Sequence, residues 1–152
     1  MSRFEIPEKI PSFVKQHLTL YLESNGEEGH MWQGPSGMDP VPTLLLTTLG
    51  HLSKRQRIMP LIYGKRGADH IVVASKGGAP AHPAWYLNLE KMPEVDVQVA
   101  TEKFRARART AKGEERSLLW DMMSEIFSPY NDYQKAARSR EIPVVVLETI
   151  TP

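Results

Sequence analysis

The sequence contains no cysteine, and this absence excludes several kinds of active site. A chain without cysteine has no disulfide bond, no thiolate nucleophile and no cysteine-ligated zinc. Its five histidines stand at unrelated positions and form no paired-histidine motif, so we expect no metal centre. The glycine patterns of Rossmann and P-loop nucleotide sites and the serine elbow of hydrolases are also missing. Thiol, metal and serine-triad catalysis are therefore not expected.

The chain also lacks a dominant charge and a long apolar run. Its 19 lysines and arginines balance 18 aspartates and glutamates, so the net charge of +1 demands neither nucleic acid nor an anionic membrane. No apolar run approaches the length that spans a bilayer, and the first residues lack the apolar core of a signal peptide. With 152 residues, we expect a single domain located in the cytoplasm.

The most informative stretch begins at residue 71, where an apolar strand leads through a glycine turn into an aromatic helix. Residues 71–74 are apolar, and the first three of them are β-branched. The Ser-Lys-Gly-Gly of residues 75–78 ends the strand with one hydroxyl, one ammonium and two residues without side chains. Residues 82–83 begin a helix whose free N–H groups add partial positive charge. Trp85 and Tyr86 offer flat surfaces. We interpret the stretch as a site for an anion and a planar ring, although a strand, a turn and a helix with a core tryptophan explains the residue types equally well.

A second basic segment occupies residues 50–57. Lys54, Arg55 and Arg57, together with the Ser53 hydroxyl, would suit phosphate or carboxylate groups, because arginine offers a planar fork of donors and lysine a point charge. The alternative is a solvated basic loop.

Three arginines alternate with small or aromatic residues over 104–109, so they project from one face of the expected strand. Such a row could hold RNA phosphates. It lacks exposed aromatic residues on the same face, however, and it has acidic neighbours. We therefore expect a solvated or salt-bridged face and no nucleic-acid partner.

The N-terminal part of the chain predicts one helix and a long loop. Apolar residues at helical spacing over 14–22 follow Ser12 as a plausible N-cap, and the helix packs on its own domain or lies weakly on a membrane surface. Residues 25–41 form a loop whose His30, Met31 and Trp32 either cover a substrate or anchor the loop to the core.

The remaining pattern is that of an α+β protein built around a small barrel, because hairpin-connected strands come first and helices later. Pro60 predicts that its strand is at an edge or bulged, since proline donates no ladder hydrogen bond. The apolar side of the helix over 114–127 is expected to hold Leu118, Leu119, Met122, Met123 and Ile126. Strands are expected at 43–48, 57–63, 71–74, 95–99, 104–109 and 142–147.

Residues 43–148 resemble the deazaflavin-dependent nitroreductase family through L-L-T-T-L-G, R-x-x-P-L-I-Y, V-V-A-S-K-G-G-x-P-x-H-P-x-W-Y-x-N-L, F-x-A-R-A-R and I-P-V-V-V-L-E. The resemblance implies a split β-barrel like that of the flavin-binding pyridoxamine-phosphate oxidase group, with flanking helices. It also implies that the protein binds reduced coenzyme F420 and passes hydride to a quinone, a nitro compound or an activated alkene such as an enone. Residues 1–41 would cover the site, and residues 42–152 would form the cofactor-binding barrel.

The resemblance also implies roles for individual residues. Tyr130, Tyr133 and Ser75 are candidate catalytic residues, because a hydroxyl near the acceptor can stabilise or protonate the oxygen that gains charge; packing and turn capping are the alternatives. The cofactor-binding residues it implies are Ser53, Lys54, Arg55, Arg57, Pro60, Leu61, Ile62, Tyr63, Val73, Ala74, Ser75, Lys76, Gly77, Ala84, Trp85, Tyr86, Asn88 and Tyr130.

The basic loop departs from the family pattern Gly-Arg-x-Ser-Gly-x-x-Arg, because His51 stands for the arginine and Lys54 for the second glycine. FMN is therefore kept as an alternative cofactor. A module that binds a flavin or lipid without turnover is an alternative function. Flavin barrels of the wider group are often dimers, so a homodimer is also considered.

Overall fold

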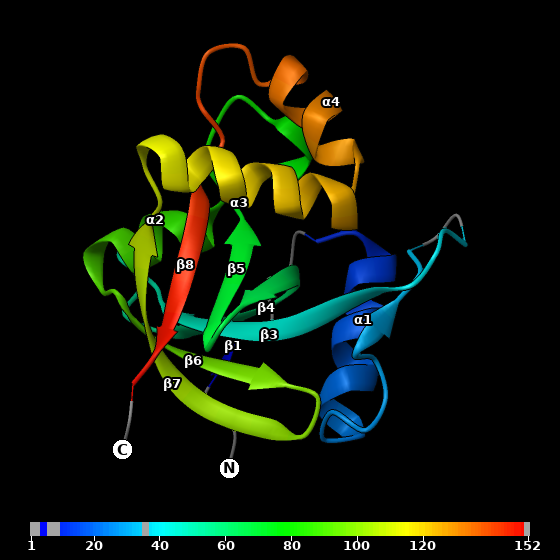
Figure 1. Cartoon of the computed structure of the whole chain (residues 1–152). Coiled ribbons are helices and arrows are strands. Elements are labelled where there is room, and N and C mark those ends of the chain that lie inside the picture. Colours follow the sequence, from blue (N-terminus) through cyan, green and yellow to red (C-terminus); the bar gives the residue numbers. More distant parts are fainter. Residues whose placement is uncertain (1–3, 6–9, 35–36, 151–152) are drawn as a thin grey trace.

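The computed structural model describes residues 4–5, 10–34 and 37–150 (Figure 1). Within these ranges the strands are β1 (Phe4–Glu5), β2 (Met31–Trp32), β3 (Val41–Leu49), β4 (Gln56–Arg66), β5 (Asp69–Val73), β6 (Glu94–Val99), β7 (Glu102–Thr110) and β8 (Val144–Thr149). The helices are α1 (Ser12–Glu23), α2 (Ala84–Lys91), α3 (Gly113–Ile126) and α4 (Pro129–Ala136), with one 3-10 turn, η1 (Lys76–Gly78).

Six antiparallel strands close into a barrel in the order β3, β4, β5, β8, β7, β6 and back to β3. These are the six strands predicted from apolar runs and from apolar alternation, so the α+β barrel is confirmed. The two-residue strands β1 and β2 add to the edges of β4 and β3. Neither is signalled by the sequence, and β2 lies inside the stretch expected to be a loop.

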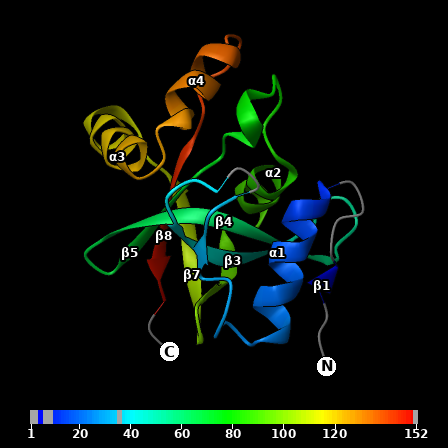
Figure 2. The same ribbon diagram turned by 90° about the vertical axis from the view of Figure 1, so that its right-hand side faces the viewer.

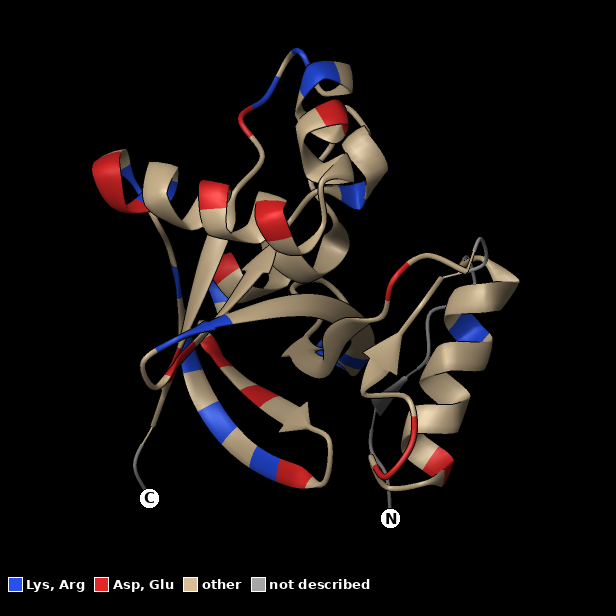
Figure 3. Cartoon of the chain, turned by 45° about the vertical axis from the view of Figure 1, so that its right-hand side comes forward, with Lys and Arg blue, Asp and Glu red and all other residues tan. Residues whose placement is uncertain are grey.

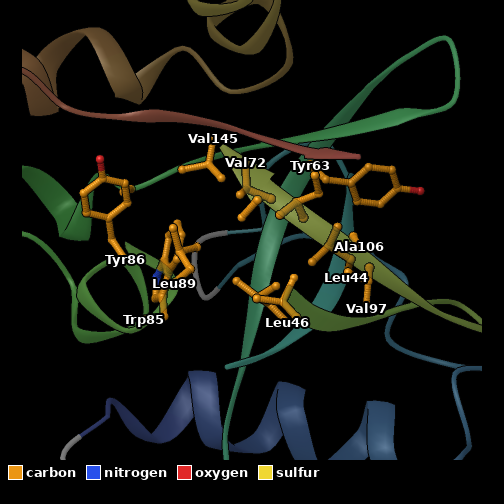
Figure 4. Packing of buried hydrophobic residues seen from close by; sticks show 14 residues of the cluster. Leu44, Leu46, Tyr63, Val72, Trp85, Tyr86, Leu89, Val97, Ala106 and Val145 are labelled. Carbon is orange, nitrogen blue, oxygen red and sulfur yellow. The ribbon is translucent and has the colours of Figure 1, made fainter. Parts of the chain in front are cut away.

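The barrel interior is filled by every second side chain of the strands, because successive side chains of a strand point to opposite faces. Figure 4 shows Leu44, Leu46, Val97 and Val145 meeting there. One end of the barrel is closed by α2, whose aromatic and leucine side chains belong to the same buried cluster. The interior is therefore a packed core, and a ligand must bind outside it.

The outer surface of the barrel is covered by helices on two sides (Figure 2). On one side, α3 and α4 bury residues such as Leu119 and Met123 against β5 and β8. On another, α1 packs against β3 and β4. Tyr21 fixes α1 there, because its Oη donates to the Thr43 carbonyl at 3.0 Å and accepts the Ala100 N–H at 2.7 Å. The helix thus packs on its own domain, as the sequence favours.

Two local predictions are wrong. Ser12 is the first residue of α1 and not its N-cap, which is Pro11 with φ −57° and ψ 148°. No side chain caps this helix end. Leu118 was expected in the core but is 49% exposed. The reason is that α3 faces the barrel through Leu119 and Met123, four residues apart, so a residue one position away points about 100° aside.

The row of arginines on β7 is salt-bridged, as predicted (Figure 3). Arg105 bonds Asp96 at 3.0 Å, and Arg107 bonds Glu94 at 3.1 Å. Arg109 contacts Glu115 at 2.6 Å and Glu148 at 3.2 Å. Because all three guanidinium groups have carboxylate partners, the row offers no unneutralised surface for phosphates. Exposed pairs of this kind add little stability.

Candidate functional site

A cavity of about 680 Å³ opens where α1, β4, η1, α2 and α4 meet. This volume lies within the range of roughly 300–1,000 Å³ that is usual for small-molecule sites. We call it the central cavity. Most residues implied by the family resemblance line it: Ser53, Arg57, Pro60, Leu61, Ile62, Val73, Ser75, Lys76, Gly77, Ala84, Trp85, Asn88, Tyr130 and Tyr133.

One wall of the central cavity is an edge of β4. This strand pairs with β3 from Gln56 to Ile62. On its other side it pairs with β1 only at Gln56 and Arg57 and with β5 only from Tyr63 onward. Within the described ranges, residues 58–62 have no strand on that side. The prediction that Pro60 marks an edge is confirmed. The edge presents backbone donors and acceptors to the cavity, where a flat ligand could take the place of a strand.

A second wall is the turn that follows β5. Ser75 has right-handed backbone angles (φ −78°), whereas Lys76 and Gly77 are left-handed (φ 48° and 63°). Successive right- and left-handed residues form a nest, a concavity of backbone N–H groups that binds anions. A lysine in the left-handed region costs about 1–2 kcal/mol. Gly78 is required by packing, because a Cβ there would lie 2.8 Å from the Tyr133 carbonyl on α4.

The three residues that carry the candidate hydroxyls all line the central cavity. The rings of Tyr130 and Tyr133 pack edge to face, with centroids 6.3 Å apart. Burial raises the pKa of Tyr130, so its hydroxyl stays neutral and can donate a hydrogen bond. Among the described residues, no hydrogen-bond partner is found for the hydroxyls of Ser75, Tyr130 or Tyr133, which leaves them to a ligand or to water.

Five of the implied cofactor-binding residues do not line the central cavity: Lys54, Arg55, Tyr63, Ala74 and Tyr86. Tyr63 and Tyr86 belong to the barrel core. The Tyr63 hydroxyl bonds Nε2 of His30 at 2.8 Å, and the Tyr86 hydroxyl bonds that of Thr110 at 2.8 Å. Their predicted contact with a cofactor stays a prediction.

The basic loop of residues 50–57 is a tight turn held from α2. The Asn88 side-chain oxygen accepts the backbone N–H of His51 at 3.0 Å and lies 2.7 Å from its ring Nδ1, which therefore carries a hydrogen. The Asn88 amide nitrogen donates to Thr48 at 3.0 Å. The Asn88 side chain is therefore used to hold the loop, and only 3% of the residue is exposed at the cavity wall. Lys54, at the position of the family glycine, keeps a glycine-like φ of 63°.

The N-terminal wall of the central cavity was not foreseen in detail. Pro11, Val14 and His17 from the start of α1, together with Trp32, line it. The Trp32 ring lies parallel to that of His17 at 5.4 Å. His17 donates its Nε2 hydrogen to the Gly29 carbonyl at 2.7 Å, and burial lowers its pKa. The available signal was the helical spacing of Val14 and His17, which indicates a buried face but not what it borders.

Comparisons with known proteins agree on one family. The model of the F420H(2)-dependent quinone reductase family matches residues 13–149. The chain belongs to this family. An F420H(2)-dependent quinone reductase of Mycobacterium tuberculosis (strain ATCC 25618 / H37Rv) is 35% identical over 137 residues, 88% of each chain. Family membership identifies the protein as an F420H(2)-dependent oxidoreductase of the quinone reductase type, and it does not favour FMN or a binding module without turnover.

Solved structures give the same picture. The structure of an F420-H2 dependent reductase is 39% identical with a TM-score of 0.65, over 70% of this chain and 94% of that chain. A structure described as a domain-swapped dimer is 34% identical with a TM-score of 0.67, over 90% of this chain and 98% of that chain. A Listeria innocua protein assigned as a pyridoxamine 5'-phosphate oxidase, 10% identical with a TM-score of 0.51 over 88% and 94% of the two chains, shares the fold alone. The predicted split barrel is confirmed.

Two kinds of feature are absent from the described residues. No helix there has the length and apolar character needed to cross a membrane. No group of three or more histidine or acidic side chains is arranged to hold a metal ion.

Proposed function

We propose that the central cavity holds reduced coenzyme F420 with its ring along residues 58–62 of β4, and that a quinone stacks on the ring. The observation that carries this proposal is the β4 edge at residues 58–62, where no described strand pairs on one side and which lines the same cavity as the nest at Ser75–Gly77. An edge of backbone groups fits the polar rim of a planar heterocycle, and the nest fits an anionic oxygen. The bound cofactor would supply a hydride.

The residues at one end of the cavity suit an anionic tail. Ser53 and Arg57 line this end together with His51, whose ring nitrogen bonds the Asn88 side chain. Guanidinium groups bind phosphates and carboxylates with paired hydrogen bonds. The cavity therefore has an apolar slot for a ring and a basic end for a charged chain, which supports the fit of the cofactor.

The hydroxyls of Tyr130, Tyr133 and Ser75 are proposed to serve the acceptor. A quinone oxygen gains negative charge when it is reduced, and a hydroxyl aimed at it can stabilise that charge or deliver a proton. Burial raises the pKa of Tyr130, which suits its hydroxyl to hydrogen bonding with that oxygen. Such positioned groups contribute about 10²–10⁴-fold to a rate.

The N-terminal helix and the loop of residues 25–41 are proposed to cover the site. Val14, His17 and Trp32 line the central cavity from this side, which supports the role. The same helix exposes Phe13 (37%) and Leu20 (45%), which supports weak association with a membrane surface. A homodimer, a cytoplasmic location and the use of nitro compounds or enones as acceptors stay predictions.

A reoxidation assay tests the function. The purified protein would be mixed with reduced F420 and a water-soluble quinone, and the return of the oxidised cofactor's absorbance would be followed. The expected result is enzyme-dependent reoxidation that requires the quinone. Reduced FMN in place of F420 serves as the control for the cofactor. Binding of F420 without turnover would indicate a binding module, and faster turnover with FMN would overturn the cofactor assignment.

A further inference from the structure

Arg140 lies outside the central cavity and closes the back of the turn at Ser75. Its guanidinium donates to three backbone carbonyls of that turn: from Nη2 to Ser75 at 2.7 Å, from Nη1 to Ala74 at 3.1 Å and from Nε to Ala79 at 2.9 Å. Nη1 also lies 3.0 Å from Nδ1 of His82, which accepts the hydrogen bond. One side chain therefore bonds both ends of the turn, from 61 to 66 residues away in the sequence.

The direction of these carbonyls fixes the direction of two amides. In a planar trans peptide, the C=O of one residue and the N–H of the next point in opposite directions. Because the carbonyls of Ala74 and Ser75 point at Arg140, the N–H groups of Ser75 and Lys76 point away from it. Ser75 and Lys76 line the central cavity, whereas Arg140 does not. The two N–H groups are thus turned toward the ligand side of the wall.

The charge of Arg140 is not cancelled by a carboxylate. All four of its acceptors are uncharged carbonyls or an imidazole nitrogen, and the neighbouring Glu141 approaches Arg116 instead. In the described part of the chain, no acidic side chain forms an ion pair with Arg140. A positive charge behind the oxygen ends of two peptides strengthens the positive field at their N–H ends.

We propose that Arg140 is a positioning residue, which aims and polarises the Ser75 and Lys76 amides so that they bind an oxygen-bearing, electron-rich edge of the cofactor. The residue is itself held in place: the Gln134 side chain of α4 donates to the Arg140 carbonyl at 2.9 Å and accepts the Ile142 N–H at 2.8 Å. This role rests on the proposed function, because the ligand at the Ser75 wall is taken to be F420.

Only a guanidinium fits this role, since lysine lacks the planar fork that reaches several carbonyls at once. The test therefore uses Arg140→Ala with added guanidinium chloride, at concentrations far below those that unfold the protein. Arg140→Lys keeps the charge without the geometry. The exposed Arg138→Ala is the matched control. F420 dissociation constants are measured by fluorescence, and folding is checked by circular dichroism and the melting temperature.

The expected result is a loss of F420 affinity of about tenfold or more in Arg140→Ala, restored by guanidinium but not by equal sodium chloride. Arg140→Lys is expected to stay weak, and Arg138→Ala to match wild type. Unchanged F420 affinity in Arg140→Ala would overturn the proposal. So would a loss of affinity in Arg140→Ala that added guanidinium does not restore, if Arg140→Lys binds F420 as tightly as wild type does. If Arg140→Ala does not fold, Arg140→Gln takes its place under the same criteria. Failure of the wild-type protein to bind F420 would instead refute the proposed function.

Discussion

The two sides of the central cavity are built differently. The barrel side consists of the β4 edge and the Ser75 turn, which are held by strand pairing, by Arg140 and by the packing of Gly78 against α4. The N-terminal side consists of α1 and Trp32, and at the cavity the Trp32 ring stacks on those of Phe13 and His17. Backbone ladders and a multiply bonded guanidinium leave little freedom, whereas ring stacking allows small shifts at low cost.

The anchor of the N-terminal side lies toward the other end of α1. Tyr21, fully buried, bonds the backbone of β3 and of the turn between β6 and β7. Phe13, near the start of the helix, is 37% exposed. We therefore propose that the barrel side binds the cofactor and that the N-terminal side contacts the acceptor.

The largest expected effect concerns the hydroxyls on the barrel side. Tyr133→Phe should lower kcat by roughly ten- to a thousandfold while leaving the F420 dissociation constant nearly unchanged, because the ring and its packing remain. Tyr130→Phe is measured beside it with the same quinone. Wild-type turnover in both variants would move the proton donor to Ser75 or to water.

The next effect concerns the basic end of the cavity. Arg57→Ala should weaken F420 binding by about 1.5–3 kcal/mol, the range for hydrogen bonds to charged groups, and high salt should reduce the difference from wild type. Arg55→Ala is the matched control, because Arg55 is in the same loop but does not line the cavity. Equal dissociation constants for Arg57→Ala and wild type would mean that the loop is only a solvated surface.

A smaller effect is expected on the N-terminal side. Trp32→Ala removes the stack on His17 and Phe13, a contact worth about 0.5–1.5 kcal/mol, and should raise the KM for the quinone severalfold. The F420 dissociation constant should stay close to wild type. A loss of cofactor affinity as large as that in Arg57→Ala would contradict the division between the two sides.

Stability should depend on pH through the buried histidines. Burial lowers the folded-state pKa of His17, His30 and His70. Since the unfolded value is about 6.5, the unfolded chain binds protons first as the pH falls. The stability that these neutral, buried histidines contribute is fully present above the unfolded-state pKa. It is lost as the pH falls toward their lowered folded-state pKa values. The melting temperature should drop between pH 7.5 and 5.5, and His17→Gln should show a shallower drop; an identical slope would contradict this.

The smallest effect concerns backbone strain in the basic loop. Lys54 has a φ of 63°, so Lys54→Gly should relieve about 1 kcal/mol of left-handed strain, offset in part by the entropy of glycine in the unfolded chain. The melting temperature should rise slightly while cofactor affinity stays unchanged, since Lys54 does not line the central cavity. A weaker F420 complex would show that the Lys54 side chain takes part in binding.

The barrel could be predicted from the sequence because some of its strands are continuous apolar runs and others alternate apolar and polar residues, and Pro60 alone indicated the edge of β4. The adjacent Trp85 and Tyr86 could not be told apart, although neighbouring helical residues point about 100° apart and only Trp85 lines the cavity. Arg140 gave no local signal, because its partners lie more than 60 residues earlier. Contacts between distant segments depend on the closed barrel and not on any local pattern.

A crystal structure of the protein with oxidised F420 would test the assignment of the two sides most directly. The cofactor ring is predicted to lie along residues 58–62 of β4, with an oxygen-bearing edge at the Ser75 and Lys76 amides and the tail near Arg57. A ring stacked instead on Trp32 and α1, with the β4 edge left to solvent, would contradict the account.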